Sequence, residues 1–108
     1  MARARGDATG ADALLADAIA SATEPELNAY GYELLQGGKS ADAIEVFRRN
    51  LREHPESWNA HDSLGEALAA KGDKTGALAE YRQARKMVKD ETNQKRIDGI
   101  LAGLEGTK

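Results

Sequence analysis

The sequence predicts an all-α protein in which pairs of helices repeat along the chain. Three observations support this fold class. Alanine, which has the highest helix propensity, is abundant, whereas only 2 prolines occur among the 108 residues. Apolar residues recur at the three- and four-residue spacing of amphipathic helices. Residues of matching type also recur 34 positions apart, which indicates an internal repeat.

The 34-residue period aligns small residues with small ones, aliphatic with aliphatic and aromatic with aromatic, without a gap. The aligned pairs are Gly31 with Gly65, Leu34 with Leu68, Gly38 with Gly72, Ala43 with Ala77, Ile44 with Leu78, Phe47 with Tyr81 and Arg48 with Arg82. We therefore divide this part of the chain into a first unit, residues 24–57, and a second unit, residues 58–91.

Each unit is predicted to form two helices. They are expected near residues 25–37 and 41–54 in the first unit, and near 58–71 and 74–89 in the second. Thr23 and Glu26 have the spacing of a capping box, in which two side chains bond each other's backbone N–H groups. Gly38 and Gly72 suit the left-handed turn that ends a helix. Ser40 is expected to cap the second helix.

Ser57 is expected to cap the third predicted helix. His54-Pro55 should stop the second helix, because the residue before a proline is biased away from helical geometry. Asp90 is expected to stop the fourth.

Both flanks add a predicted helix. We expect residues 1–23 to form an arm with an amphipathic helix near 10–22, and residues 92–108 to form a last helix near 92–105 with a short tail. The apolar positions that predict them are Ala11, Leu14, Leu15, Ala18, Ile19 and Ala22, then Ile97, Ile100, Leu101 and Leu104.

These units resemble the tetratricopeptide repeat, whose unit has a large residue, Leu-Gly, an aliphatic residue, Ala, an aromatic residue, Ala and Pro at set places. The corresponding residues are Leu27, Tyr30-Gly31, Leu34, Ala43, Phe47, Asn50 and Pro55, then His61, Leu64-Gly65, Leu68, Ala77, Tyr81, Ala84 and Lys89. Asn50 and Lys89 depart from the pattern. The resemblance implies a right-handed helical solenoid of two helix pairs with a C-terminal capping helix. Gly31 should then pack against Ala43, and Gly65 against Ala77.

Composition excludes several classes of protein. The net charge of -3 provides no basic field for nucleic acid, and the lack of cysteine excludes disulfides and thiolate metal sites. No apolar run approaches the roughly 20 residues that span a bilayer. We expect a cytoplasmic protein, or a fragment of a larger one, that binds neither membrane nor nucleic acid.

No catalytic or cofactor chemistry is evident, so we expect no enzyme, no metal and no cofactor. His61, Asp62 and Ser63 are consecutive, and neighbours on a helix point about 100 degrees apart, which prevents a catalytic relay. His61 is expected to pack between helices. The basic residues of the second helices alternate with acidic ones, as on a solvated helix face.

The resemblance implies a protein-protein interaction module that binds a peptide or protein segment on its concave face. The implied partner-binding residues are Asn28, Tyr32, Leu35, Asn59, Asp62, Ser63, Glu66 and Arg96. Tyr32 serves either as an exposed anchor or as a packing residue under the N-terminal helix. The clamp that holds a chaperone's C-terminal carboxylate is absent, because the matching places, Asn28, Tyr32, Ser63, Asn93 and Ile97, hold no cation.

Two alternatives remain open. Residues 27–68 resemble the repeats appended C-terminally to some bacterial serine hydrolases and peptidases, so the chain is alternatively an accessory domain of a larger hydrolase. A short array with exposed ends can also associate with itself as a homodimer.

Overall fold

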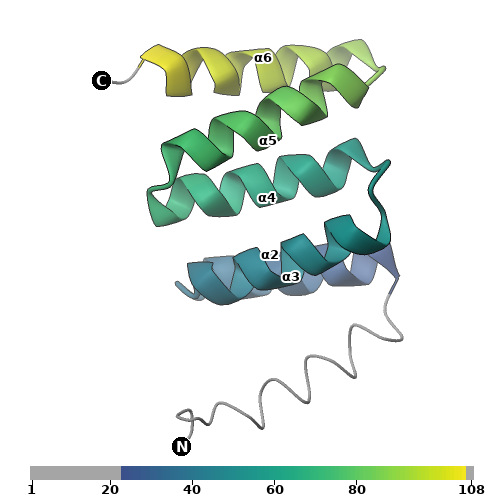
Figure 1. Ribbon diagram of the computed structural model, residues 1–108, viewed down its shortest axis with the longest axis vertical. Helices are drawn as coiled ribbons and strands as arrows, with labels where there is room; N and C mark the ends of the chain where they lie inside the picture. The colour runs from purple at the N-terminus through teal and green to yellow at the C-terminus, as the bar shows by residue number, and fades with distance from the viewer. Residues whose placement is uncertain (1–22, 107–108) are drawn as a thin grey trace, which may run out of the picture.

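A computed structural model of the chain describes residues 23–106. They form five helices and no strand: α2 (Glu24–Gln36), α3 (Ser40–Glu53), α4 (Trp58–Lys71), α5 (Lys74–Met87) and α6 (Glu91–Gly106). The helices stack along the long axis, from α2 and α3 at one end to α6 at the other (Figure 1). The all-α prediction is confirmed, with these bounds within about two residues of those expected. The helix predicted near residues 10–22 lies outside the described residues.

Short-range side-chain bonds set where several helices begin. The capping box is present: the Thr23 backbone N–H donates to Glu26 Oε1 at 2.8 Å, and the Glu26 N–H donates to Thr23 Oγ1 at 3.4 Å. Ser57 Oγ accepts from the N–H of Ala60 at 3.2 Å. These two predicted caps are confirmed, and both bonds satisfy donors that the first helical turn leaves free.

Two predicted boundary roles are wrong. Ser40 does not cap α3, because it is already the first helical residue and Lys39 occupies the cap position without a side-chain bond. The turn at Gly38, with φ of 80°, is closed by a Lys39 N–H bond to the Leu34 carbonyl at 2.9 Å, so α3 starts early.

Asp90 does not stop α5, which ends at Met87 where Val88 adopts an extended conformation. Asp90 instead accepts from the N–H of Asn93 at 2.9 Å, as a cap of α6 does. This bond lowers the pKa of the Asp90 carboxyl.

The core lies between the helix pairs and runs through both units. Its buried residues come from α3, α4, α5 and α6, together with Val88: Ala43, Ile44, Phe47, Leu64, Ala67, Leu68, Ala77, Tyr81, Ala84, Val88 and Ile97. Phe47 is the largest side chain that is fully buried. A smaller cluster, Leu27 with Val46, joins α2 to α3.

Two glycines allow the helices of each unit to pack closely. A β-carbon on Gly31 would lie 2.3 Å from the Phe47 ring, and one on Gly65 would lie 3.0 Å from the Tyr81 ring. The nearest atoms to each glycine therefore belong to the aromatic ring, whereas the sequence pointed to Ala43 and Ala77. The aromatic ring, four residues after the alanine and thus on the same side of its helix, provides the nearest atoms instead.

Substitution of these glycines should separate steric clash from helix propensity. Gly31→Ala should lower the free energy of unfolding by about 1–3 kcal/mol, because the fully buried Phe47 ring has little room to move. Gly65→Ala should be nearly neutral, since its milder clash is offset by a propensity gain of about 1 kcal/mol. Gly103→Ala, with no atom within 4 Å, should stabilise the protein. Urea unfolding followed by the fluorescence of Trp58 measures all three, and a stable Gly31→Ala variant would contradict the packing argument.

Asn50 is a buried polar residue without a hydrogen bond. Its side chain is 0% exposed, and neither Oδ1 nor Nδ2 has a partner. The equivalent place in the second unit, 34 residues on, holds Ala84, which is also 0% exposed. A buried amide that leaves water without a new partner destabilises the folded state.

Asn50→Ala should therefore raise the free energy of unfolding by about 1 kcal/mol, because the penalty of the unpaired amide is removed. The matched variant Ala84→Asn should lower it by about 1–3 kcal/mol. Thermal unfolding monitored by circular dichroism compares both variants with the wild-type chain. A destabilised Asn50→Ala protein would show that the amide contributes favourably to folding.

Candidate partner-binding face

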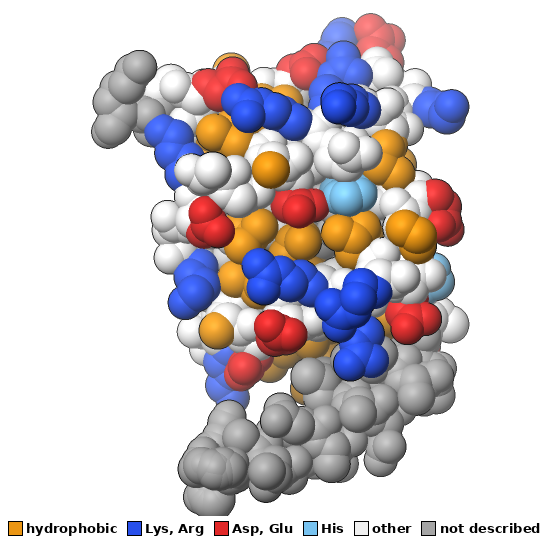
Figure 2. All heavy atoms as spheres, in the orientation of Figure 1, with side chains coloured by type: hydrophobic (Ala, Val, Ile, Leu, Met, Phe, Trp, Pro, Cys, Tyr) orange, Lys and Arg blue, Asp and Glu red, His pale blue; other side chains and the backbone are white. Residues whose placement is uncertain are grey.

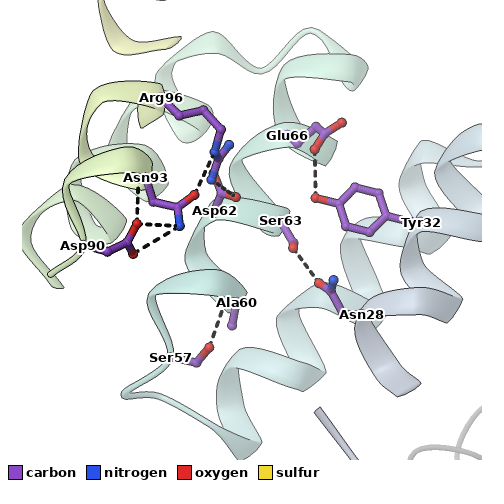
Figure 3. Close-up of polar contacts among 10 residues, drawn as sticks. All are labelled: Asn28, Tyr32, Ser57, Ala60, Asp62, Ser63, Glu66, Asp90, Asn93 and Arg96. Atoms are coloured by element: carbon purple, nitrogen blue, oxygen red, sulfur yellow. Dashed lines mark hydrogen bonds and ion pairs between the residues drawn. The ribbon is translucent and has the colours of Figure 1, made fainter. Parts of the chain in front are cut away.

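Helices α2, α4 and α6 form one surface, which we call the inner face, and polar side chains link them across it (Figure 3). Tyr32 on α2 donates its hydroxyl hydrogen to Glu66 Oε1 on α4 at 2.8 Å. Ser63 Oγ on α4 donates to Asn28 Oδ1 on α2 at 2.5 Å. Arg96 Nη2 on α6 donates to Asp62 Oδ2 on α4 at 2.8 Å.

The spacing of these partners follows from the repeat. Tyr32 and Glu66 are 34 residues apart, as are Asp62 and Arg96, and Asn28 and Ser63 are 35 apart. The Ser57 hydroxyl also donates to Glu24, 33 residues away. Because each unit places its first helix beside the equivalent helix of the next, residues one period apart meet. We call these four contacts the polar ladder.

Three consecutive residues of α4 contact three different helices. His61 Nδ1 lies 2.7 Å from Glu80 Oε1 on α5, whereas Asp62 bonds to α6 and Ser63 bonds to α2. This divergence separates the three side chains that a catalytic relay would have to join. His61 is partly buried between α4 and α5. Within residues 23–106, no group of three or more His, Asp or Glu side chains could hold a metal ion.

Tyr32 is half-buried, and two contacts fix its position: Phe47 packs against its ring, and Glu66 accepts from its hydroxyl. The ring packs edge-on against Phe47, with centroids 5.2 Å apart and planes at 66°. Burial, assisted by the charges of Glu66 and Asp62, raises the pKa of Tyr32 to about 12. The pKa of Tyr81 is also raised, mainly by burial and then by the charges of Asp62 and Glu66. Asp62 and Glu66 thus lie near both phenol groups.

The two carboxylates of this face differ in environment. The Asp62 side chain is only 9% exposed; Arg96 binds Oδ2, while Oδ1 has no hydrogen-bond partner. That bond raises the pKa of Arg96, whose side chain is 42% exposed. Glu66 is exposed and contacts the Tyr32 hydroxyl, and no cation of the described residues pairs with it. The two carboxylates are therefore not equivalent: Asp62 is paired with Arg96, whereas Glu66 bonds to the Tyr32 hydroxyl.

Six of the eight predicted partner-binding residues thus meet as three pairs on the inner face. Of the other two, Leu35 packs against the core and Asn59 is half-buried. Sequence reasoning placed Asn93 on this face but did not predict that its Oδ1 accepts from Arg96 Nε at 3.1 Å. It also did not predict the contact of Glu24 with Ser57. The 34-residue period itself could have predicted the pairs, because their members lie one period apart in the sequence.

The face of the molecule seen in Figure 2 mixes charges of both signs. Arg82 pairs with Glu105 at 2.8 Å, and Arg85 pairs with Asp98 at 2.7 Å. A shallow pocket of about 230 Å³ opens between α3 and α4, lined by Ala41, Ile44, Glu45, Arg48, Leu68, Lys71 and Asp73. Neither region concentrates one sign of charge.

The sequence model described as Tetratricopeptide repeat matches residues 28–92, which is more than half of the chain. The chain belongs to the tetratricopeptide repeat family. A search among curated proteins found no match. Tetratricopeptide repeats are typically non-catalytic modules that bind other proteins, and protein interaction is accordingly the general function of this chain. None of the described helices is long and apolar enough to cross a membrane.

The raised pKa of Tyr32 predicts a loss of stability in alkali. Above pH 10.0 the tyrosine of the unfolded chain ionises, whereas folded Tyr32 stays protonated up to about pH 12. The folded state then binds more protons, so the free energy of unfolding falls as pH rises through this window. Near pH 11 the loss from one such tyrosine is on the order of 1 kcal/mol. Urea unfolding of the wild-type chain and Tyr32→Phe at pH values across this window should show a shallower fall for the variant. An unchanged fall would contradict this account.

Proposed function

We propose that the inner face binds a segment of a partner protein. The polar ladder carries this proposal, because it holds aromatic and charged side chains of three helices in set positions before a ligand arrives. Groups that are ordered in advance lose less conformational entropy on binding, which favours affinity.

The exposed parts of this face suit recognition of a peptide. Tyr32 and Leu35 offer partly exposed apolar surface one helical turn apart on α2. Glu66 and Arg96 offer exposed charges on α4 and α6. Exposed ion pairs contribute only about 0–1 kcal/mol each, so contact with Tyr32 should supply much of the affinity.

Two more specific proposals differ in the identity of the partner. A catalytic domain of a bacterial hydrolase in a longer chain would use the repeats as an accessory domain. A second copy of the chain would make the repeats a homodimerisation module. Both are compatible with an interaction surface on α2, α4 and α6. The paired charges of α5 and α6 favour protein over nucleic acid as the partner.

The test is capture of partners from the source lysate on the immobilised chain, followed by mass spectrometry and titration of the identified segment. Tyr32→Ala should weaken binding at least about tenfold, as loss of a central aromatic anchor does. Glu53→Gln, which alters an exposed residue at the end of α3, should leave binding unchanged.

Trp58 fluorescence verifies that each variant is folded, and Tyr32→Phe separates loss of the ring from loss of the hydroxyl. Undiminished binding by a folded Tyr32→Ala protein would place the partner outside the inner face. Concentration-dependent self-association lost in Tyr32→Ala would instead identify a second copy as the partner.

A further inference from the structure

We propose that the inner face recognises a basic side chain, arginine or lysine, of the partner segment, beside Tyr32 and Glu66 and in competition with Arg96 for Asp62. This inference rests on the proposed function and names the chemistry of the ligand.

The charges of the face are unbalanced. Asp62 and Glu66 lie four residues apart on α4 and so share one side of the helix. Arg96 neutralises only Asp62, which leaves the Glu66 carboxylate uncompensated among the described residues. A basic side chain would balance this charge, whereas an acidic side chain would meet two carboxylates and an arginine that is already engaged.

Asp62 has an acceptor that Arg96 leaves unused. Its Oδ1 is screened from solvent and has no donor, although the side chain is 9% exposed and carries a charge. Leaving such an oxygen unpaired is unfavourable. A guanidinium offers five N–H donors in a planar fork and can bind both oxygens of a carboxylate.

Arg96 controls access to that carboxylate. Its Nη2 and Nε bond to Asp62 and Asn93, and its side chain is 42% exposed. Because it lies at the solvent edge of the pair, it can turn away when a ligand cation replaces it. Arg96 is therefore a competitor of a basic ligand, whereas for an acidic ligand it would be the contact.

Tyr32 supplies an aromatic ring next to the uncompensated charge. Its hydroxyl is bonded to Glu66, and its packing against Phe47 holds the ring in one orientation. The faces of aromatic rings attract cations, and arginine stacks on them well. The ring and the carboxylate together favour a cation over a neutral group of equal length.

The experiment is a titration of the ¹⁵N-labelled chain with four blocked amino acids, followed by amide chemical shifts. The probes are the N-acetyl methylamides of arginine, lysine, norleucine and glutamate. Arginine and lysine should shift the amides of Tyr32, Asp62, Glu66 and Arg96, with Kd on the order of 1 mM for ligands of this size. Norleucine, which lacks the charge, and glutamate should bind more weakly.

Two variants with opposite expected effects sharpen the test. Glu66→Gln should weaken arginine binding about two- to fivefold, the value of one exposed ion pair. Arg96→Gln should tighten it by a similar factor, because the competitor for Asp62 is removed. Glu53→Gln, an exposed glutamate of α3, serves as the matched control and should change nothing.

Equal shifts with all four probes, no shift with any of them, or weaker arginine binding in Arg96→Gln would overturn the inference. The proposed function would survive these outcomes if a captured partner segment still depended on Tyr32. Loss of that dependence, with arginine binding intact, would instead refute the proposed function and leave a cation site.

Discussion

The contact between a helix backbone and an aromatic ring determines the spacing of each helix pair. Gly31 meets the Phe47 ring at a distance that leaves no room for a β-carbon, and Gly65 meets the Tyr81 ring at a distance that leaves little room for one. Each glycine lets the first helix of its unit approach the second, and the ring then fills the space between them. Since a glycine meets an aromatic ring in both units, 34 residues apart, the two helices of each pair approach each other through the same kind of contact. The inner face is a consequence of this repetition.

The polar ladder depends on that arrangement but contributes little to holding it. Partly exposed hydrogen bonds such as that of Tyr32 with Glu66 contribute about 1 kcal/mol or less each. Their main effect is to orient side chains that would otherwise be mobile. A surface ordered in this way is suited to binding, and the proposed recognition of a basic side chain rests on the Glu66 charge and on Asp62 Oδ1.

A comparison of the two units shows that equivalent positions between the helices can hold either apolar or polar side chains. Leu27 and Val46 form a buried apolar pair in the first unit, while the equivalent places 34 residues on hold His61 and Glu80 in a polar contact of 2.7 Å. Both pairs join the first helix of a unit to its second. Complementarity between the partners matters more here than hydrophobicity. Asn50 shows the limit of this tolerance, because its amide lies in the place of Ala84 without any partner.

The sequence by itself determined the helices, most of their ends and the family. These features depend on local spacing: the helical period, the capping box at Thr23 and the left-handed turn at Gly72, with φ of 95°, involve residues close in the chain. Only the tertiary structure decided that Gly31 meets the Phe47 ring, that Arg96 pairs with Asp62 and not with Glu66, and that the Asn50 amide has no partner. The 34-residue period indicates which residues of the inner face lie near one another, but it does not determine which hydrogen bonds they form. Hydrogen bonds form within about 3 Å, and separations that small between helices depend on how every side chain of the core packs.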